Sequence, residues 1–206
     1  MTKAEMMLAL QAARVVPVVR TSTAAHAATA VGWLRDAGIR IFELTMTIPD
    51  APALIRELAG EPDLLLGAGT VADVATAEAC LAAGARFIVA PWTDPALAAP
   101  CRAAGALLML GALTPTEVRA ALAAGADVVK IFPASSVGGP GHIKALASVF
   151  PGVAFCPTGG VEPGNVAAFL AAGAAFVGMG GALVDAQRIA AGDRAAIAAA
   201  AKAILS

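Results

Sequence analysis

A recurring pattern of hydrophobic and polar positions divides the chain into alternating helical and strand-like segments. Five times, an alanine-rich helical stretch stops at a glycine, and a short apolar run with strand character begins within a residue or two. Glycine at the end of a helix adopts the left-handed conformation without a Cβ penalty, so each unit predicts a helix, a stop and a strand. The five glycines are Gly38, Gly84, Gly105, Gly125 and Gly173.

Three further apolar runs, at 14–20, 64–69 and 153–158, bring the strand candidates to eight. Apolar strands that alternate with helices predict parallel pairing with the helices outside, and eight such units predict closure into a (β/α)8 TIM barrel. We expect a single domain over residues 1–206, with an extra N-terminal helix. Three side chains at expected helix starts, Asp50, Asp94 and Thr114, are predicted to cap them. An open flavodoxin-like sheet is the competing architecture.

Composition and charge exclude several classes of function. The chain is 59% hydrophobic with a net charge of −1, so it has no electrostatic footprint for nucleic acid or for an anionic membrane surface. Residues 163–184 carry no formal charge and are long enough to cross a bilayer, but the break at Ala172-Gly173 predicts a helix followed by a strand instead. We therefore expect neither a nucleic-acid nor a membrane partner.

Cysteine and histidine usage argues against disulfides and metal. The three cysteines are odd in number, lie far apart and form no CxxC pair, which predicts a reduced, cytoplasmic protein without a zinc site. Two histidines without a nearby acidic cluster also make a metal site unexpected. We expect no metal and no cofactor.

Lys130 is the most informative polar residue, because it interrupts the buried run "DVVKIFPA" at 127–134. Val129 and Ile131 share the face that must pack against helices, so Lys130 is predicted to point into the barrel near the end of its strand. Burial of an unpaired lysine lowers its pKa and leaves a free amine, which attacks ketones to form an imine. An exposed or snorkelling lysine is the ordinary alternative.

Glu43 interrupts the second predicted strand, in the run "RIFELTMTIPD", in the same way, since Ile41, Glu43 and Thr45 share one face. A carboxylate beside the lysine is the proton-transfer partner that imine chemistry needs. A structural ion pair with an inward cation is the alternative role, and the two are compatible. We predict Lys130 and Glu43 as the catalytic residues.

Polar groups at other strand ends are predicted to meet on the same rim of the barrel. Arg20 ends the first strand, and its planar fork suits a carboxylate. Glycine pairs after the seventh and eighth strands let backbone N–H groups converge, as in many phosphate-binding barrels. The predicted substrate-binding residues are Arg20, Thr70, Pro91, Phe132, Thr158, Gly159, Gly160, Gly180 and Gly181.

Six short motifs in order, "FELT", "GAGTV", "FIVAP", "VVKIFPA", "FCPTGG" and "VGMGGALV", resemble the class I 2-keto-3-deoxy-6-phosphogluconate (KDPG) aldolases and their relatives acting on the galactonate epimer and on 4-hydroxy-2-oxoglutarate. The resemblance implies reversible cleavage of a 2-keto-3-deoxy-6-phosphosugar acid to pyruvate and glyceraldehyde 3-phosphate by a metal-free homotrimer of barrels. It also implies that Lys130 forms the imine and that Glu43 is the acid/base. Thr70 would lie near the pyruvyl carboxylate, Pro91 and Phe132 around the pyruvyl part, and Gly159 and Gly160 at the phosphate.

Two positions depart from the family pattern. Thr47 stands where many members carry an arginine, so we assign the carboxylate to Arg20. Gly181 stands where a serine usually offers its hydroxyl to phosphate, and losing a hydrogen bond to a charged group costs about 1.5–3 kcal/mol. An unphosphorylated 2-keto-3-deoxy acid or 4-hydroxy-2-oxoglutarate is therefore an alternative substrate. A sugar-phosphate isomerase or epimerase barrel and a non-catalytic phosphosugar sensor are the other functions considered.

Overall fold

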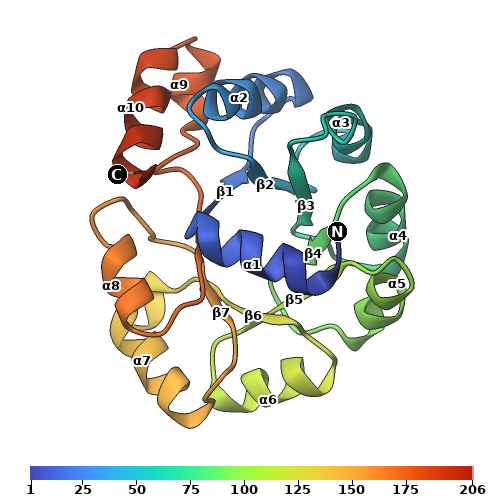
Figure 1. Cartoon of the computed structure of the whole chain (residues 1–206), viewed down its shortest axis with the longest axis vertical. Helices are drawn as coiled ribbons and strands as arrows, with labels where there is room; N and C mark the ends of the chain where they lie inside the picture. The colour runs from blue at the N-terminus through green and yellow to red at the C-terminus, as the bar shows by residue number, and fades with distance from the viewer. Residues whose placement is uncertain (206) are drawn as a thin grey trace.

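Eight parallel strands wrap into a barrel in the computed structural model, which describes residues 1–205 (Figure 1). They pair in the order β7-β6-β5-β4-β3-β2-β1-β8, and two isolated bridges, Phe155–Ala174 and Thr158–Gly178, join β7 to β8 and close the barrel. This arrangement confirms the predicted TIM barrel over the open sheet. The strands are β1 (Val15–Val19), β2 (Ile41–Thr45), β3 (Leu65–Gly69), β4 (Phe87–Val89), β5 (Leu107–Ala112), β6 (Val128–Ile131), β7 (Phe155–Pro157) and β8 (Val177–Met179).

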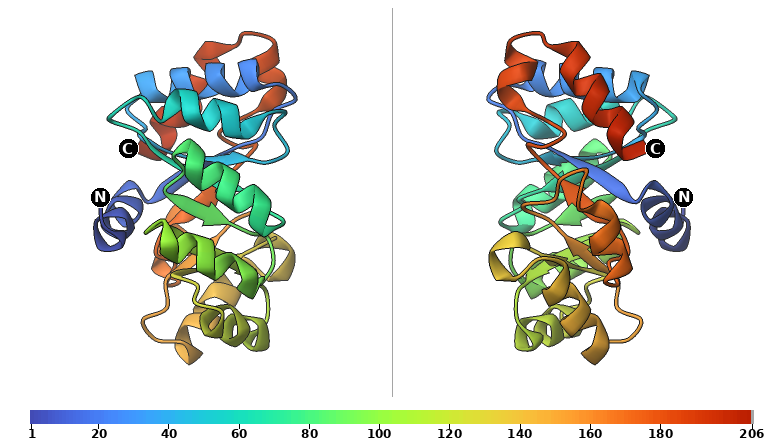
Figure 2. Two further views of the ribbon diagram at one scale, coloured as in Figure 1. Left: turned by 90° about the vertical axis from the view of Figure 1, so that its right-hand side faces the viewer. Right: turned by 90° about the vertical axis from the view of Figure 1, so that its left-hand side faces the viewer.

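A ring of helices surrounds the strands, and the N-terminal helix α1 lies across one end of the barrel (Figures 1 and 2). The α-helices are α1 (Lys3–Ala13), α2 (Ala24–Asp36), α3 (Ala51–Leu58), α4 (Val74–Ala83), α5 (Ala98–Ala103), α6 (Pro115–Ala123), α7 (Pro140–Val149), α8 (Val166–Ala171), α9 (Ala186–Ala190) and α10 (Arg194–Leu205). Two short 3-10 helices, η1 (Pro95–Leu97) and η2 (Ser135–Val137), precede α5 and α7. None of the helices within residues 1–205 has the length and apolar character needed to cross a lipid bilayer, and residues 163–184 contain α8 and β8 instead.

Successive strand residues face two different hydrophobic clusters, as the pattern of period two predicts. Ile41 and Val128 lie in the cluster inside the barrel, together with Met6 and Leu10 of α1. The alternate residues of each strand pack against the surrounding helices in the larger cluster. Because α1 covers the end where the strands begin, the opposite end, where they finish, is left for the cavity.

The five predicted helix stops are confirmed, whereas one of the predicted helix N-caps is wrong. All five stop glycines adopt a positive φ of 64° to 111°. Thr114 forms a capping box with Glu117, and the Asp94 carboxylate accepts a hydrogen bond from the Ala96 N–H. Asp50 makes no capping bond, because Pro52 lacks an N–H and the Ala53 N–H donates to the Asp50 backbone carbonyl instead.

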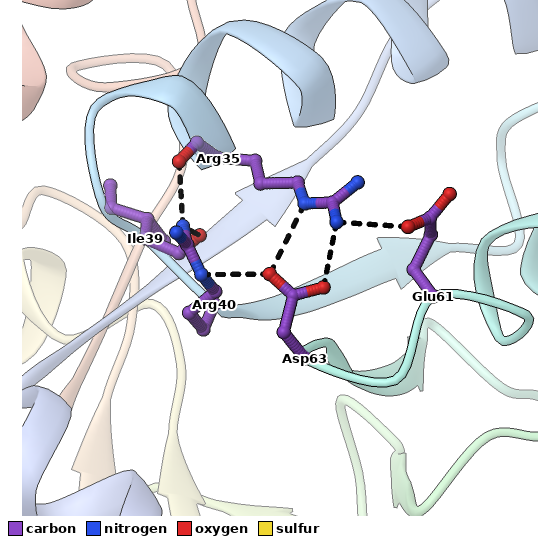
Figure 3. Close-up of polar contacts among 5 residues, drawn as sticks. All are labelled: Arg35, Ile39, Arg40, Glu61 and Asp63. Carbon is purple, nitrogen blue, oxygen red and sulfur yellow. Dashed lines mark hydrogen bonds and ion pairs between the residues drawn. The ribbon is translucent and has the colours of Figure 1, made fainter.

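A group of charged residues fixes the starts of β2 and β3 at the α1 end of the barrel (Figure 3). Arg35, at the end of α2, donates to the Asp63 carboxylate and also contacts Glu61, each at 2.8 Å. Arg40, just before β2, approaches the other Asp63 oxygen at 2.9 Å. Partial desolvation opposes ionisation of Asp63, but the hydrogen bond and charge of Arg35 outweigh it and lower the pKa of that carboxyl. Asp63 therefore ties α2, β2 and β3 together as an anion.

Candidate active site

A cavity of about 540 Å³ opens where the strands end, and its lining includes residues that directly follow β1, β3, β7 and β8. All nine predicted substrate-binding residues line it, and Lys130 does so as well. Val18, Val161, Glu162 and Ala182 complete the lining. Residues distant in the sequence are therefore brought to one site because parallel strands place all their carboxyl ends on the same side.

Lys130 and Glu43 form a buried ion pair inside the barrel. The Lys130 Nζ lies 3.4 Å from Glu43 Oε1, and the two side chains are only 7% and 6% exposed. Lys130 comes from β6 and Glu43 from β2, so 87 residues of sequence separate them. Removing either partner would leave an uncompensated charge in a poorly solvated place. Lys130 lines the cavity, whereas Glu43 is not among the lining residues within 1–205 and contacts the site through the Lys130 amine.

Gly69 creates the space in which the Glu43 carboxylate lies. A methyl group at Gly69 would overlap the Glu43 carboxylate, because Thr45 and Gly69 are register partners on neighbouring strands and the Glu43 side chain reaches across β3. No separate feature of the sequence singles out this glycine. The sequence feature that contains Gly69 is the run of small residues "GAGT" at 67–70, which is part of the "GAGTV" motif.

Arg20 is held at the cavity by two threonine hydroxyls. Its guanidinium nitrogens donate to Thr47 Oγ1 and Thr70 Oγ1, each at 3.0 Å. Thr45 and Thr47 also share a hydrogen bond of 2.7 Å. Thr70 has a φ of +57°, a left-handed conformation that is costly for a β-branched residue and that is found most often at functional sites. Thr47 and Thr70 thus position Arg20, which directly follows β1.

Two glycine pairs, one after β7 and one after β8, supply free backbone donors to the cavity. Gly159 and Gly160 adopt φ of +89° and +71°. Within residues 1–205, the N–H groups of Gly159, Gly160, Gly180 and Gly181 donate no hydrogen bond. Consecutive unpaired N–H groups of this kind form a concave site suited to an anion. A side chain at Gly181 would meet open space. Because this residue is glycine, it can offer a ligand only its backbone.

The remaining predicted residues form the walls near Lys130. The Phe132 ring centroid lies 5.6 Å from Lys130 Nζ, and 40% of Phe132 is exposed toward solvent. Pro91 follows β4, and the Thr158 side chain is buried where Gly178 leaves room for it. Cys156 of β7 is the register partner of Lys130, and burial raises the pKa of its thiol to about 12. This thiol therefore stays neutral.

Metal ligation finds no support in the side chains of this region. Across residues 1–205, no three His, Cys, Asp or Glu side chains lie close enough together to hold a metal ion. Among the lining residues within 1–205, Glu162 is the only acidic one, and it was not predicted because it lies beyond the "FCPTGG" motif.

Comparisons with known proteins agree on one family. Residues 6–200 match the family model described as "KDPG and KHG aldolase". A 2-dehydro-3-deoxy-phosphogluconate aldolase of Treponema pallidum is 38% identical over 90% of this chain and 89% of its own length. A KHG/KDPG aldolase of Escherichia coli is 35% identical over 87% of this chain and 84% of its own.

The solved structures agree with the sequence relatives. A KDPG aldolase from Legionella pneumophila, with pyruvate captured as a covalent carbinolamine intermediate, superimposes with a TM-score of 0.87 at 32% identity. The match covers 96% of this chain and 97% of that one. Since the family model spans nearly the whole chain and both relatives exceed 30% identity over most of it, the chain belongs to the KDPG and KHG aldolase family.

Proposed function

We propose that this protein is a class I aldolase that reversibly cleaves KDPG, or its galactonate epimer, to pyruvate and glyceraldehyde 3-phosphate. The observation that carries the proposal is the buried Lys130–Glu43 pair at 3.4 Å, placed at a cavity lined by the other predicted residues. The names of the relatives and the covalent pyruvate adduct in the Legionella enzyme support the same reaction.

Lys130 acts as the nucleophile in this proposal. After passing a proton to Glu43, its amine adds to the C2 carbonyl of the keto acid, and loss of water from the carbinolamine gives an imine. Removal of the C4 hydroxyl proton then breaks the C3–C4 bond and releases the aldehyde. The electron pair of the broken bond remains on the pyruvyl part, which becomes an enamine. Protonation at C3 and hydrolysis release pyruvate and restore the amine. Glu43, helped by water, is the acid/base for these transfers.

The rest of the cavity orients the keto acid. Arg20, held by Thr47 and Thr70, binds the carboxylate through its planar guanidinium, and Thr70 lies beside it. Pro91, Phe132 and Thr158 pack around the pyruvyl part. Gly159, Gly160, Gly180 and Gly181 bind the distal phosphate through their unpaired N–H groups. No metal or cofactor takes part.

Gly181 favours a second candidate substrate class. With no hydroxyl at this position, the phosphate has one donor fewer than a serine would give it. Cleavage of 4-hydroxy-2-oxoglutarate (KHG) or of an unphosphorylated 2-keto-3-deoxy acid is therefore the alternative. The name of the E. coli relative includes KHG beside KDPG. The same imine chemistry serves each substrate.

Assembly and location form part of the proposal. Trp92 and Phe132 are large apolar residues that are 49% and 40% exposed, which suits self-association into the homotrimer that the resemblance implies. Sedimentation equilibrium tests this by asking whether the particle has three times the chain mass of 20.3 kDa. Cys80, Cys101 and Cys156 are free thiols, in keeping with a cytoplasmic location.

Borohydride trapping tests the mechanism directly. Reduction in the presence of pyruvate should fix a three-carbon adduct on Lys130, which peptide mass spectrometry would locate. Lys130→Met should lose both the adduct and at least about 10³-fold in kcat, because no other lysine within residues 1–205 lines the cavity.

Lys144→Met is the matched control, since Lys144 is an exposed lysine on α7 outside the cavity. It should retain the adduct and normal turnover. Persistent activity in Lys130→Met, or an adduct on another lysine, would remove the proposed mechanism. Turnover that survives without any trapped pyruvate would instead favour an isomerase or epimerase barrel.

A further inference from the structure

Glu162 is a charged residue of the cavity that the proposed reaction does not use. It is the acidic member of the lining and follows Val161, directly after the Gly159-Gly160 turn. Its side chain is exposed, and it forms no ion pair within the part of the chain that the structure describes, residues 1–205. A solvated carboxylate therefore stands beside the backbone donors assigned to the distal phosphate.

The loop that carries Glu162 is fixed by Asn165. The Glu162 N–H donates to Asn165 Oδ1, and Asn165 Nδ2 donates to the Gly160 carbonyl, each at 2.9 Å. These two bonds hold Glu162 next to the glycine turn and occupy its own N–H. Glu162 consequently adds a negative charge to this end of the cavity without adding a free backbone donor.

Both cations that line the cavity already have partners. Arg20 donates to Thr47 and Thr70, whereas Lys130 pairs with Glu43. No lysine or arginine other than these two lines the cavity within residues 1–205. None of the lining residues within 1–205 therefore neutralises Glu162 when a second anion arrives.

A phosphate and a hydroxyl at the distal end of the substrate would interact very differently with this end of the cavity. The phosphate dianion accepts hydrogen bonds from the glycine N–H groups, but Glu162 repels it, and Gly181 supplies no hydroxyl to compensate. A substrate hydroxyl is neutral and can donate a hydrogen bond to the Glu162 carboxylate. The local chemistry thus weakens selection for the phosphate ester and adds a contact for the free sugar acid.

We propose that Glu162 is a specificity-determining residue that lowers the preference for a phosphorylated substrate and accepts a hydrogen bond from a distal hydroxyl. The enzyme then also cleaves the unphosphorylated 2-keto-3-deoxy acid. This inference rests on the proposed aldolase function and concerns only the end of the substrate that does not react.

The test compares kcat/KM for KDPG and for 2-keto-3-deoxygluconate in the native enzyme, Glu162→Gln and Glu162→Lys. Glu162→Gln should raise the ratio of phosphorylated to unphosphorylated kcat/KM by about three- to tenfold, and Glu162→Lys should raise it further. Because Glu162 is exposed, high ionic strength should shrink both differences. Glu78→Gln, the same change on the exposed face of α4, should leave the ratio unaltered at every salt concentration.

Failure of this inference is distinguishable from failure of the proposed function. Normal pyruvate release with an unchanged ratio in both Glu162 variants would overturn the role of Glu162 alone. Absence of pyruvate release from either substrate, together with no borohydride adduct in the native enzyme, would overturn the aldolase function itself.

Discussion

The position of the Glu43 carboxylate depends on a residue without a side chain. Gly69 ends β3 beside β2, and the space that its missing Cβ leaves is filled by the Glu43 carboxylate. The Lys130–Glu43 separation of 3.4 Å follows from that placement. A small displacement of a proton-transfer group costs catalysis far more than it costs folding, because proton transfer requires hydrogen-bond reach.

Gly69→Ala should therefore act on chemistry. The added methyl forces the Glu43 carboxylate away from its place, and we expect kcat to fall by about 10²-fold while the carboxylate contact of Arg20, and hence KM, changes little. Steady-state kinetics and borohydride trapping measure this. Gly32→Ala is the control, because Gly32 lies in α2 with open space around it, and alanine there should be neutral or stabilising by up to about 1 kcal/mol. Equal losses in both variants would disprove the steric argument.

Residues that break a pattern were predictable, and residues that fit one were not. Lys130 and Glu43 stand out because each puts a charge on the buried face of a strand. Gly69 looks like any small residue in a tightly packed barrel, and Glu162 looks like any exposed loop glutamate. Their significance comes from what lies opposite them in space, namely a carboxylate and a glycine turn, and no local pattern contains that information.

At the scale of elements, α1 serves as a plug for the barrel. Met6 and Leu10 are fully buried among inward-facing strand residues, and Lys3 donates to the Asp127 carboxylate at 2.7 Å. Asp127 also accepts the Leu108 N–H, so one carboxylate joins the helix to the start of β5. The apolar interior of the barrel would otherwise face water at this end, which makes the extra helix part of the core.

Leu10→Ala should destabilise the protein by about 2–5 kcal/mol, because it leaves a cavity between the plug and the barrel. Urea unfolding monitored by circular dichroism measures this. Leu8→Ala offers a matched comparison in the same helix, since Leu8 is 65% exposed and its loss should change stability by no more than about 0.5 kcal/mol. Similar values for the two variants would show that α1 is not packed as a plug. In folded Leu10→Ala, kcat/KM should stay close to native because the cavity lies at the opposite end.

The order of the eight strands and the presence of the N-terminal helix were predictable from the chain, whereas details at element ends were less so. Glycine stops and period-two strands are local signals, and the barrel contains each of them. The failed Asp50 cap shows the limit, since the choice between a side-chain and a backbone acceptor at Ala53 depends on how the turn enters α3. Sequence identifies a capable residue, but the path of the chain decides whether it is used.

At the scale of the whole molecule, the burial of the three cysteines makes the stability of the protein depend on pH in the alkaline range. Cys80, Cys101 and Cys156 lie in different parts of the barrel, and all three are buried. Desolvation raises the pKa of Cys80 and of Cys101 to about 11, and that of Cys156 to about 12, from 9.0. The chain contains no tyrosine, so that common source of titration between pH 9 and 11 is absent.

The free energy of unfolding should consequently fall as the pH rises from about 9 toward 11. In that window the unfolded chain loses thiol protons that the folded protein keeps, so the unfolded state gains stability, by up to about 1.4 kcal/mol per pH unit for each thiol. Below pH 9 both states hold these protons, and the contribution is constant. Urea unfolding midpoints across this range measure the slope, and replacing all three cysteines by alanine should flatten it whatever its effect on absolute stability. An equally steep decline in the triple variant would assign the alkaline loss to other groups, and rapid alkylation of the native thiols at pH 8 would contradict their burial.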